Sequence, residues 1–444
     1  MNHSESPQNR PFHVMTKPAG PACNLDCTYC FYTSKVELYP GRKQWAMPED
    51  VLETYVRQYI EAQDAEEIHF AWQGGEPTLR GLDFFKKAVE FQKKYANGKK
   101  ITNAFQTNGV LIDENWARFF VENEFLIGLS IDGPPKHHNR YRIDHGGRGS
   151  AQRVLRALEL FKQHKVEFNT LTCVHAGNVD KPLEIYRFLK NAGSRFLQFI
   201  PIIEAASEDW VEGGDGHTHP VPPPGRKVTA WSVEPMAYGK FLTDIFDYWV
   251  RHDVGREFVQ LFDVTLQSWA GYPPGLCVYA PTCGEGLALE HNGDLYACDH
   301  YVYPEFLRGN VMETPVGELV RSDAQQSFGA AKRDSLPEYC RKCPYLFACN
   351  GGCPKERFMT TPDGEPGLNY LCPAYKHFFS HVAPFMEVMA REVKNGRPAA
   401  NVMRHPVTAA AGGRINAFPN PNDACPCGSG RKYKKCCGGK GVLQ

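Results

Sequence analysis

The chain has 444 residues, which is long for a single domain and predicts two or three. Hydrophobic residues make up 42% of it, so a large core can form and wholesale disorder is excluded. Fifty basic residues balance fifty acidic ones, so no overall field favours nucleic acid or membranes. No apolar run approaches the ~20 residues of a membrane span, and the polar start MNHSESPQNRPF lacks the apolar core of a signal peptide. We therefore expect a cytoplasmic protein without specific nucleic-acid binding.

Sixteen cysteines in a chain without a secretion signal favour metal ligation over disulfides. They gather near residues 23–30, between 277 and 372, and between 425 and 437. Only Cys173 stands apart, in the apolar run NTLTCVHA, where a buried strand cysteine is expected. So many clustered thiolates suggest a protein that avoids oxygen.

The first predicted strand, Phe12–Met15, precedes the motif Cys23-Asn-Leu-Asp-Cys27-Thr-Tyr-Cys30. Three cysteines at this spacing can bind three irons of a 4Fe–4S cube and leave the fourth iron without a protein ligand. An open iron can chelate the amino and carboxylate groups of S-adenosylmethionine (SAM), so the spacing suggests cluster-driven radical chemistry. A zinc site would need a fourth ligand, and none is nearby in the sequence. Tyr29 precedes the last cysteine, as an aromatic does in the radical SAM signature.

Apolar runs then alternate with helical patterns along the chain. The further predicted strands are Ile68–Trp72, Ile101–Gln106, Leu126–Ile131, Phe168–Val174 and Phe196–Ile202. The predicted helices are Glu49–Gln63, Leu82–Tyr95, Glu114–Glu122, Ala151–His164 and Lys181–Asn191. Repeated strand–helix units predict parallel strands with right-handed crossovers. Six units are too few for an eight-fold barrel, so we expect an α/β fold with a partial (β/α)6 barrel and its chemistry at the carboxyl ends of the strands.

Two further motifs fall at this rim of the predicted barrel. Gln73-Gly74-Gly75-Glu76-Pro77 follows the second strand, where glycines let the backbone approach a ligand and Glu76 can accept from an ammonium group. The same residues also suit a tight strand-to-helix turn. Ser130-Ile-Asp132-Gly133-Pro134 ends the fourth strand and can place a hydroxyl on the ligand's ribose or carboxylate.

The region from Glu204 to Pro235 breaks the pattern, and its run GGDGHTHPVPPPGR predicts an exposed, irregular insertion. Its His217 and His219 are interpreted as surface histidines rather than as a metal pair. Two amphipathic, aromatic-rich helices follow and are expected to form a connector, namely Met236–Arg251 and Glu257–Ala270.

The second metal region holds eight cysteines: Cys277, Cys283, Cys298, Cys340, Cys343, Cys349, Cys353 and Cys372. They can bind two 4Fe–4S clusters, two zinc ions, or one of each, and spacing alone does not decide. Glu290-His-Asn-Gly-Asp294 predicts a hairpin turn just before Cys298. Ser380–Val393 is the last helical pattern.

Residues 394–421 are predicted to form a flexible linker. A small module follows it and contains Cys425, Cys427, Cys436 and Cys437. Four cysteines in so short a stretch need a metal to fold, because almost no core is available. We expect a zinc knuckle. The alternative is a simple nucleic-acid patch formed by the basic run RKYKK.

At this point the sequence resembles the anaerobic sulfatase-maturating enzymes, radical SAM proteins with a SPASM domain, over about residues 11–390. The resemblance rests on KPAGPACNLDCTYCFY, WQGGEPTL, LSIDGP, LALEHNGDLYACDHYVYPEF and YCRKCPYLFACNGGCPKERF, followed by Cys372. The terminal module resembles a SEC-C zinc motif, which is not part of the minimal maturase. The implied domains are a radical SAM partial barrel (1–235), a helical connector (236–270), a SPASM domain (271–393), a linker (394–421) and a zinc module (422–444).

The resemblance implies three 4Fe–4S clusters and SAM as cofactors, with Zn²⁺ in the terminal module. One auxiliary cluster would be held by Cys277, Cys283, Cys298 and Cys353, and the other by Cys340, Cys343, Cys349 and Cys372. The matching SAM-binding positions are Tyr29, Gln73, Gly74, Gly75, Glu76 and Ser130. The family's catalytic acid–base carboxylate follows the third SPASM cysteine, which makes it Asp299 here.

The implied reaction oxidises one cysteine or serine side chain of an unfolded or nascent sulfatase to Cα-formylglycine under anaerobic conditions. A 5′-deoxyadenosyl radical from SAM takes a hydrogen from the target β-carbon, Asp299 takes the thiol or hydroxyl proton, and the auxiliary clusters take an electron. Flavodoxin or ferredoxin would supply reducing electrons, and the terminal module would contact an acidic surface of the ribosome or export machinery. The rival functions are a thioether-forming SPASM peptide maturase and a non-enzymatic metal-binding scaffold.

Overall fold

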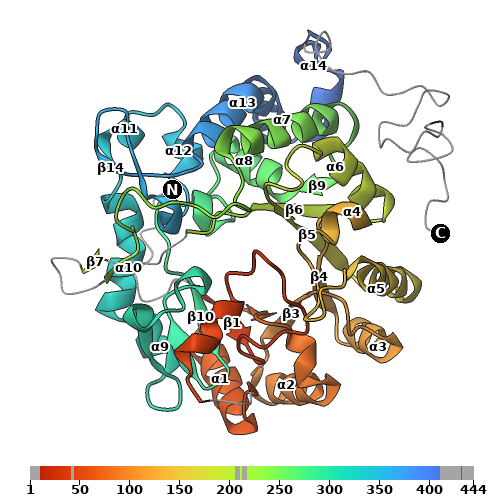
Figure 1. Cartoon of the computed structure of the whole chain (residues 1–444), viewed down its shortest axis with the longest axis vertical. Helices are drawn as coiled ribbons and strands as arrows, with labels where there is room; N and C mark the ends of the chain where they lie inside the picture. The colour runs from red at the N-terminus through yellow and green to blue at the C-terminus, as the bar shows by residue number, and fades with distance from the viewer. Residues whose placement is uncertain (1–10, 42–44, 206–210, 213–217, 411–431, 433–444) are drawn as a thin grey trace.

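The computed structural model describes residues 11–41, 45–205, 211–212, 218–410 and 432 (Figure 1). Its main sheet has ten strands in the order β12-β11-β10-β1-β2-β3-β4-β5-β6-β9. The six predicted barrel strands lie side by side in chain order, and each pairs with the next in parallel. They are β1 His13–Lys17, β2 Glu67–Trp72, β3 Lys100–Thr107, β4 Phe125–Ser130, β5 Phe168–Val174 and β6 Phe196–Pro201. The partial barrel predicted from the strand–helix alternation is therefore confirmed.

Helices cover the outside of this curved sheet (Figure 1). They are α1 Glu49–Glu61, α2 Leu82–Tyr95, α3 Glu114–Glu122, α5 Ala151–His164 and α6 Pro182–Asn191, with the short α4 Pro135–His138 after β4. Their apolar faces meet the strands in one aromatic-rich core, in which Trp72, Phe85 and Phe105 are almost fully buried. Asp113 caps α3 by accepting from the backbone N–H groups of Asn115 and Trp116. Helical periodicity placed these helices because each buries one continuous apolar stripe.

The second half of the chain extends the barrel sheet rather than forming a separate one. β10 Gly286–Glu290 pairs in parallel with β1, and β11 Asp294–Tyr296 and β12 Leu307–Asn310 continue the sheet antiparallel. The predicted hairpin turn joins β10 to β11, with Gly293 at φ 91°. At the other edge, β9 Phe258–Val259 pairs with β6, so the connector helix α8 Gln260–Ala270 begins three residues later than predicted. Pairing with β10 covers the edge of β1 that would otherwise be open.

The cysteine-rich half is built from short elements. Its helices are α9 Val316–Arg321, α10 Asp323–Asp334, α11 Glu338–Arg341 and α12 Leu346–Cys349. Its 3-10 turns are η4 Cys277–Tyr279, η5 Asp299–Tyr301, η6 Pro304–Phe306 and η7 Pro354–Glu356, and a hairpin pairs β13 Met359–Thr360 with β14 Pro366–Leu368. Near the N-terminus, η2 Thr33–Leu38 and η3 Pro77–Arg80 follow the β1 and β2 loops. Such short pieces carry too little periodicity for sequence prediction.

The C-terminal expectations were wrong in two places. The helix predicted from Ser380, α13, spans Cys372–Lys394 and thus begins eight residues earlier, because Tyr375, Phe378 and Phe379 are buried. The predicted linker is also partly ordered. η8 Ala399–Arg404 packs against α13 and α7 Pro235–His252, and α14 Pro406–Ala410 follows. Val402 is fully buried there, so packing fixes a segment whose composition suggested flexibility.

The predicted exposed insertion is also partly packed. β7 Val211–Glu212 pairs with β8 Thr218–His219, and the backbone carbonyl of Pro220 accepts a hydrogen bond from the buried Tyr301 at 2.7 Å. The N–H of Gly225 donates to the carbonyl of Phe358 at 2.8 Å, and Val233 is fully buried. The end of the insertion therefore packs against the cysteine-rich half.

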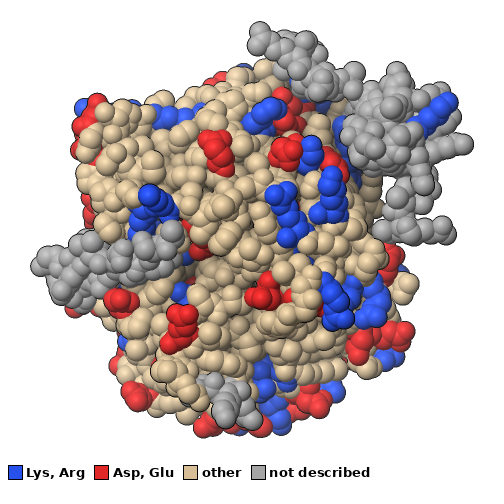
Figure 2. Space-filling model, in the orientation of Figure 1, with Lys and Arg blue, Asp and Glu red and all other residues tan. Residues whose placement is uncertain are grey.

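The surface agrees with the balanced composition. On the face shown in Figure 2, basic and acidic side chains are interspersed, and neither sign covers a continuous area. Among the described residues, no helix is both long enough and apolar enough to cross a membrane.

Candidate active site and cluster-binding cysteines

Cys23, Cys27 and Cys30 lie on one loop after β1, as predicted. Backbone hydrogen bonds tie this loop to the segment after β4, from the N–H of Asp26 to the carbonyl of Ile143 (2.8 Å) and from Thr28 to Tyr141 (3.1 Å). The Nδ2 of Asn108 lies 3.7 Å from the sulfur of Cys23. Burial raises the pKa of Cys23 to about 12, with the charges of Glu76 and Cys30 adding to it. The three thiols are close enough to act on one another electrostatically.

The glycine motif packs against the same loop. A side chain at Gly74 (φ 106°) would meet the aliphatic stem of Lys17, and one at Gly75 (φ 50°) would meet the carbonyl oxygen of Ala22 at 2.0 Å. Both glycines are therefore required by close approach of the chain to itself, in addition to any ligand. The backbone N–H of Gln73 donates to the backbone carbonyl of Thr16 and holds the end of β2 against the end of β1.

Glu76 is hydrogen-bonded to the loops around it. Its carboxylate is buried and accepts from the N–H and hydroxyl of Thr78, the hydroxyl of Thr107 and the N–H of Asn108, at 2.7–3.1 Å. These bonds join the β2 and β3 loops, and burial raises the pKa of the carboxyl. The four acceptor sites of the Glu76 carboxylate, which was expected to accept from an ammonium group, thus already have donors in these loops.

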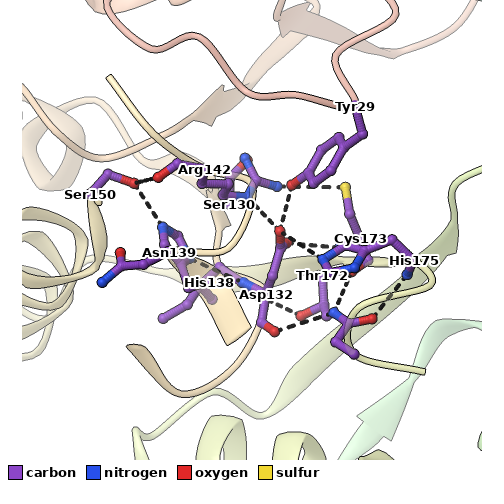
Figure 3. Close-up of polar contacts among 12 residues, drawn as sticks. Tyr29, Ser130, Asp132, His138, Asn139, Arg142, Ser150, Thr172, Cys173 and His175 are labelled. Atoms are coloured by element: carbon purple, nitrogen blue, oxygen red, sulfur yellow. Dashed lines mark hydrogen bonds and ion pairs between the residues drawn. The ribbon is translucent and has the colours of Figure 1, made fainter. Parts of the chain in front are cut away.

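A buried polar network lies under Tyr29 (Figure 3). The Tyr29 hydroxyl donates to Asp132 Oδ2 at 2.5 Å, and Arg142 Nε donates to the same oxygen at 2.9 Å. The other oxygen of Asp132 accepts from the N–H of Cys173 at 3.0 Å. Burial alone would raise the pKa of Asp132, but the charge and hydrogen bond of Arg142, together with the charges of His138 and His175, more than offset it and the pKa is lowered. Asp132 and Arg142 were not predicted as site residues, although Asp132 lies in the quoted motif after β4.

His138 extends this network to Ser150, which directly precedes α5 (Figure 3). Its Nδ1 accepts from the N–H of Asp132 at 3.3 Å, which assigns the proton to Nε2, 2.9 Å from the hydroxyl of Ser150. Ser150 in turn donates to the carbonyl of Arg142 at 2.8 Å. Burial lowers the pKa of His138 to about 4. The predicted Ser130 lies beside the network and accepts from Gln106 Nε2 at 3.0 Å.

Asp299 lies directly after Cys298 and forms an ion pair with Lys17 at the end of β1. The Lys17 side chain is 1% exposed and that of Asp299 14%. Burial on its own would raise the pKa of Asp299, but the charge and hydrogen bond of Lys17, together with the charges of His300 and Lys355, more than offset it, so the pKa is lowered. Asp299 is therefore ionised at neutral pH. Lys17 was missed because a lysine at a strand end has many ordinary roles.

The eight cysteines of the second half fall into two groups in space. Cys277, Cys283, Cys298 and Cys353, the first set, act electrostatically on one another, as the causes of their raised pKa values show. The second set, Cys340, Cys343, Cys349 and Cys372, lines one pocket. Burial raises the pKa of Cys349 to about 12 and of Cys372 to about 11. That each set binds one 4Fe–4S cluster stays a prediction.

Within the described ranges, no three His, Cys, Asp or Glu side chains converge closely enough to hold a single metal ion. A 4Fe–4S cube carries its irons at separate corners, so its thiolates stand farther apart than zinc ligands do. The zinc cysteines Cys425, Cys427, Cys436 and Cys437 lie outside the described residues, as does His217. His219 forms part of β8.

Comparison with known proteins agrees with this arrangement. The chain matches the Radical SAM superfamily over residues 18–189, the iron–sulfur cluster-binding SPASM domain over 279–344 and the SEC-C motif over 422–439. A serine-type anaerobic sulfatase-maturating enzyme of Bacteroides thetaiotaomicron is 44% identical over 401 residues, which cover 90% of this chain and 96% of that protein. A cysteine-type enzyme of Clostridium perfringens is 35% identical over 387 residues, covering 86% and 100%.

Among solved structures, native anSMEcpe with bound AdoMet and Cp18Cys peptide matches with a TM-score of 0.75 and 35% identity, covering 86% of this chain and 100% of that one. The fold and the two cysteine-bearing regions define a radical SAM enzyme with an iron–sulfur SPASM domain. Within that class, the chain belongs to the anaerobic sulfatase-maturating enzymes.

Proposed function

We propose that this enzyme oxidises a cysteine or serine side chain of an unfolded or nascent sulfatase to Cα-formylglycine, with SAM and without oxygen. Its relatives include serine-type and cysteine-type maturases, and one solved relative holds AdoMet and a peptide. The observation that carries the proposal is the pairing of β1 with β10. Through this pairing Lys17, at the end of β1, meets Asp299, and Phe31, next to Cys30, contacts the ring of His300. These contacts support a single site in which the loop of Cys23, Cys27 and Cys30 would supply the radical and Asp299 would act as the base.

The donor sets fit three 4Fe–4S clusters, one on the loop after β1 and one on each set of four cysteines. Bound at Cys23, Cys27 and Cys30, the cluster and SAM would supply the 5′-deoxyadenosyl radical, because an unactivated C–H bond has no acidity that a side chain can use. Buried thiols with raised pKa values stay protonated on their own, so cluster binding must release protons.

Asp299 would serve as the base that takes the thiol or hydroxyl proton of the target residue. The ion pair with Lys17 keeps its carboxylate charged and in one orientation. Its partial exposure leaves access for a substrate side chain, which a base must reach within hydrogen-bond distance. A carboxylate that is ionised and oriented before substrate arrives needs no further activation.

SAM would be held between the cysteine loop, the glycine motif and the end of β4. Gly74 and Gly75 would present backbone groups to it, and Gln73 and Ser130 polar side chains. Tyr29 would offer the edge of a ring fixed by Asp132. Glu76 would act by shaping the loops, since its carboxylate already accepts four hydrogen bonds.

The domain limits and remaining partners are also proposals. We assign residues 1–235 to the radical SAM domain, 236–270 to the connector and 271–393 to the SPASM domain, with a SEC-C zinc module at 422–444. That module would recruit an acidic surface of the ribosome or export machinery through Arg431, Lys432, Lys434 and Lys435. Flavodoxin or ferredoxin would donate electrons, and the cytoplasm is where unfolded sulfatases are accessible.

The test is anaerobic incubation of the reconstituted enzyme with SAM, a reductant and matched sulfatase-motif peptides that carry cysteine or serine at the target position. Mass spectrometry should show formylglycine in at least one peptide, and the ratio of the two rates gives the substrate preference. SAM cleavage without oxidation of either peptide would reject the maturase function and favour another peptide-modifying activity. No SAM cleavage at all would favour a scaffold.

A further inference from the structure

Two fully buried cations lie beside the auxiliary cysteines, Lys332 on α10 and Arg357 just after η7. Neither forms an ion pair with a carboxylate of the part of the chain that the structure describes, at the usual limit of 4.0 Å. A buried charge without an opposite charge costs several kcal/mol. Something anionic must therefore face these two side chains in the working enzyme.

Lys332 is anchored on the first set of cysteines. Its Nζ donates to the backbone carbonyl of Cys277 and, at 2.9 Å, to that of Val278. Lys332 is fully buried, and Cys283, Cys353 and Cys277 are close enough to act on it electrostatically. The carbonyls fix the position of the ammonium group but do not neutralise its charge.

Arg357 is anchored on the segment that joins the two sets. Its guanidinium donates to the carbonyls of Gly351 (2.9 Å), Asn350 (2.9 Å), Gly352 (3.3 Å) and Lys332 (2.5 Å). The first three residues lie between Cys349 of the second set and Cys353 of the first. A side chain at Gly351 would stand 2.6 Å from the Arg357 Nη2, so glycine there permits the approach. Arg357 thus lies against both sets, and Lys332 against the first alone.

We infer that Lys332 and Arg357 are the fixed counter-charges of the two auxiliary clusters, Lys332 for the cluster of the first set and Arg357 for both. This rests on the cluster assignment in the proposed function. In the proposed reaction an auxiliary cluster would accept one electron from the substrate radical while Asp299 takes a proton, and its charge would become one unit more negative. Both cations favour that reduced state, and the shared Arg357 keeps the electron near the same cation when it moves to the second cluster.

The test is an EPR-monitored redox titration of the full-length holoprotein. A background in which Cys23, Cys27 and Cys30 are alanine leaves the two auxiliary signals. Lys332→Met should make reduction of the first-set cluster at least tenfold less favourable, a shift of about −59 mV for one electron, and leave the other cluster unchanged. Arg357→Met should lower both potentials. Lys332→Arg and Arg357→Lys should restore most of each shift.

Lys99→Met is the matched control, because Lys99 also caps two backbone carbonyls, those of Ile60 and Gln63, but lies in the barrel half. It should move neither potential. Unchanged potentials in Lys332→Met and Arg357→Met at full iron content would overturn the inference. If the Met variants lose iron, retention of iron in Lys332→Arg and Arg357→Lys supports it, and loss there overturns it. A wild-type enzyme with too little iron for the auxiliary clusters would instead reject the cluster assignment.

Discussion

Replacing Asp299 with Asn tests the base directly, because Asn keeps the shape of the side chain and removes its basicity near neutral pH. We expect formylglycine formation to fall by at least ~100-fold, the low end of general-base effects. SAM cleavage should persist, because the loop of Cys23, Cys27 and Cys30 keeps its own hydrogen bonds to the segment after β4.

The same change has a cost in stability that the structure allows us to bound. Lys17 is 1% exposed and would lose the opposite charge that faces it. Breaking a buried pair in this way costs about 3–5 kcal/mol. The Asn carbonyl can still accept from Lys17, whose Nζ also lies 4.3 Å from the centre of the Tyr32 ring, so we expect the lower end of that range.

A matched variant separates the two effects. Asp253 is another buried aspartate, paired with Lys190 at 2.5 Å and bonded to the Tyr186 hydroxyl at 2.8 Å, at the end of α7. Asp253→Asn should lose stability without losing peptide oxidation. Because Lys190 is 29% exposed, Asp253→Asn should lose less stability than Asp299→Asn.

The assay follows two products in one anaerobic reaction, 5′-deoxyadenosine by chromatography and formylglycine peptide by mass spectrometry, with thermal unfolding measured alongside. A large drop in formylglycine with little change in 5′-deoxyadenosine is the expected result for Asp299→Asn alone. Near-normal peptide oxidation in this variant would refute the assignment of Asp299 as the base and leave it as the ion-pair partner of Lys17.

Three further predictions concern the clusters, the buried histidine and the terminal module. Reconstituted enzyme should hold about twelve irons, and alanine at Cys23, Cys27 and Cys30 should remove about four and abolish SAM cleavage; iron near four with zinc making up the rest would contradict this. Burial lowers the pKa of His138 to about 4, so its imidazole stays neutral in the folded protein, whereas in the unfolded chain it takes up a proton near pH 6.5. The contribution of His138 to the free energy of unfolding is therefore complete above pH 6.5 and declines as the pH falls towards 4. Over that window the wild type should lose ~3 kcal/mol more than His138→Gln in unfolding experiments, and equal losses would contradict the neutral assignment. Truncation after Pro419 should leave peptide turnover nearly unchanged but lower maturation of a full-length sulfatase in cells; loss of peptide activity with iron retained would place the module in the active site.

The sequence by itself determined what depends on neighbours along the chain. The spacing of Cys23, Cys27 and Cys30 indicated the open cluster, and helical and strand periodicity predicted the six barrel units with α2, α3 and α5 at their observed limits. The Asn292-Gly293 pair predicted the turn between β10 and β11. Each of these signals is local, because an iron ligand set, an apolar stripe or a turn is written within a few residues.

Only the tertiary structure decided which residues far apart in the sequence contact one another. No local pattern states that β10 pairs with β1, yet that pairing joins Lys17 to Asp299, which lie 282 residues apart. The sequence likewise did not predict that Arg357 and Lys332 are buried without a carboxylate partner among the described residues. Nor did it predict that η8 packs on α13. Strand pairing and charge burial depend on the surfaces that all other elements leave free. Local sequence patterns do not predict such contacts, because the residues that meet have no fixed spacing along the chain.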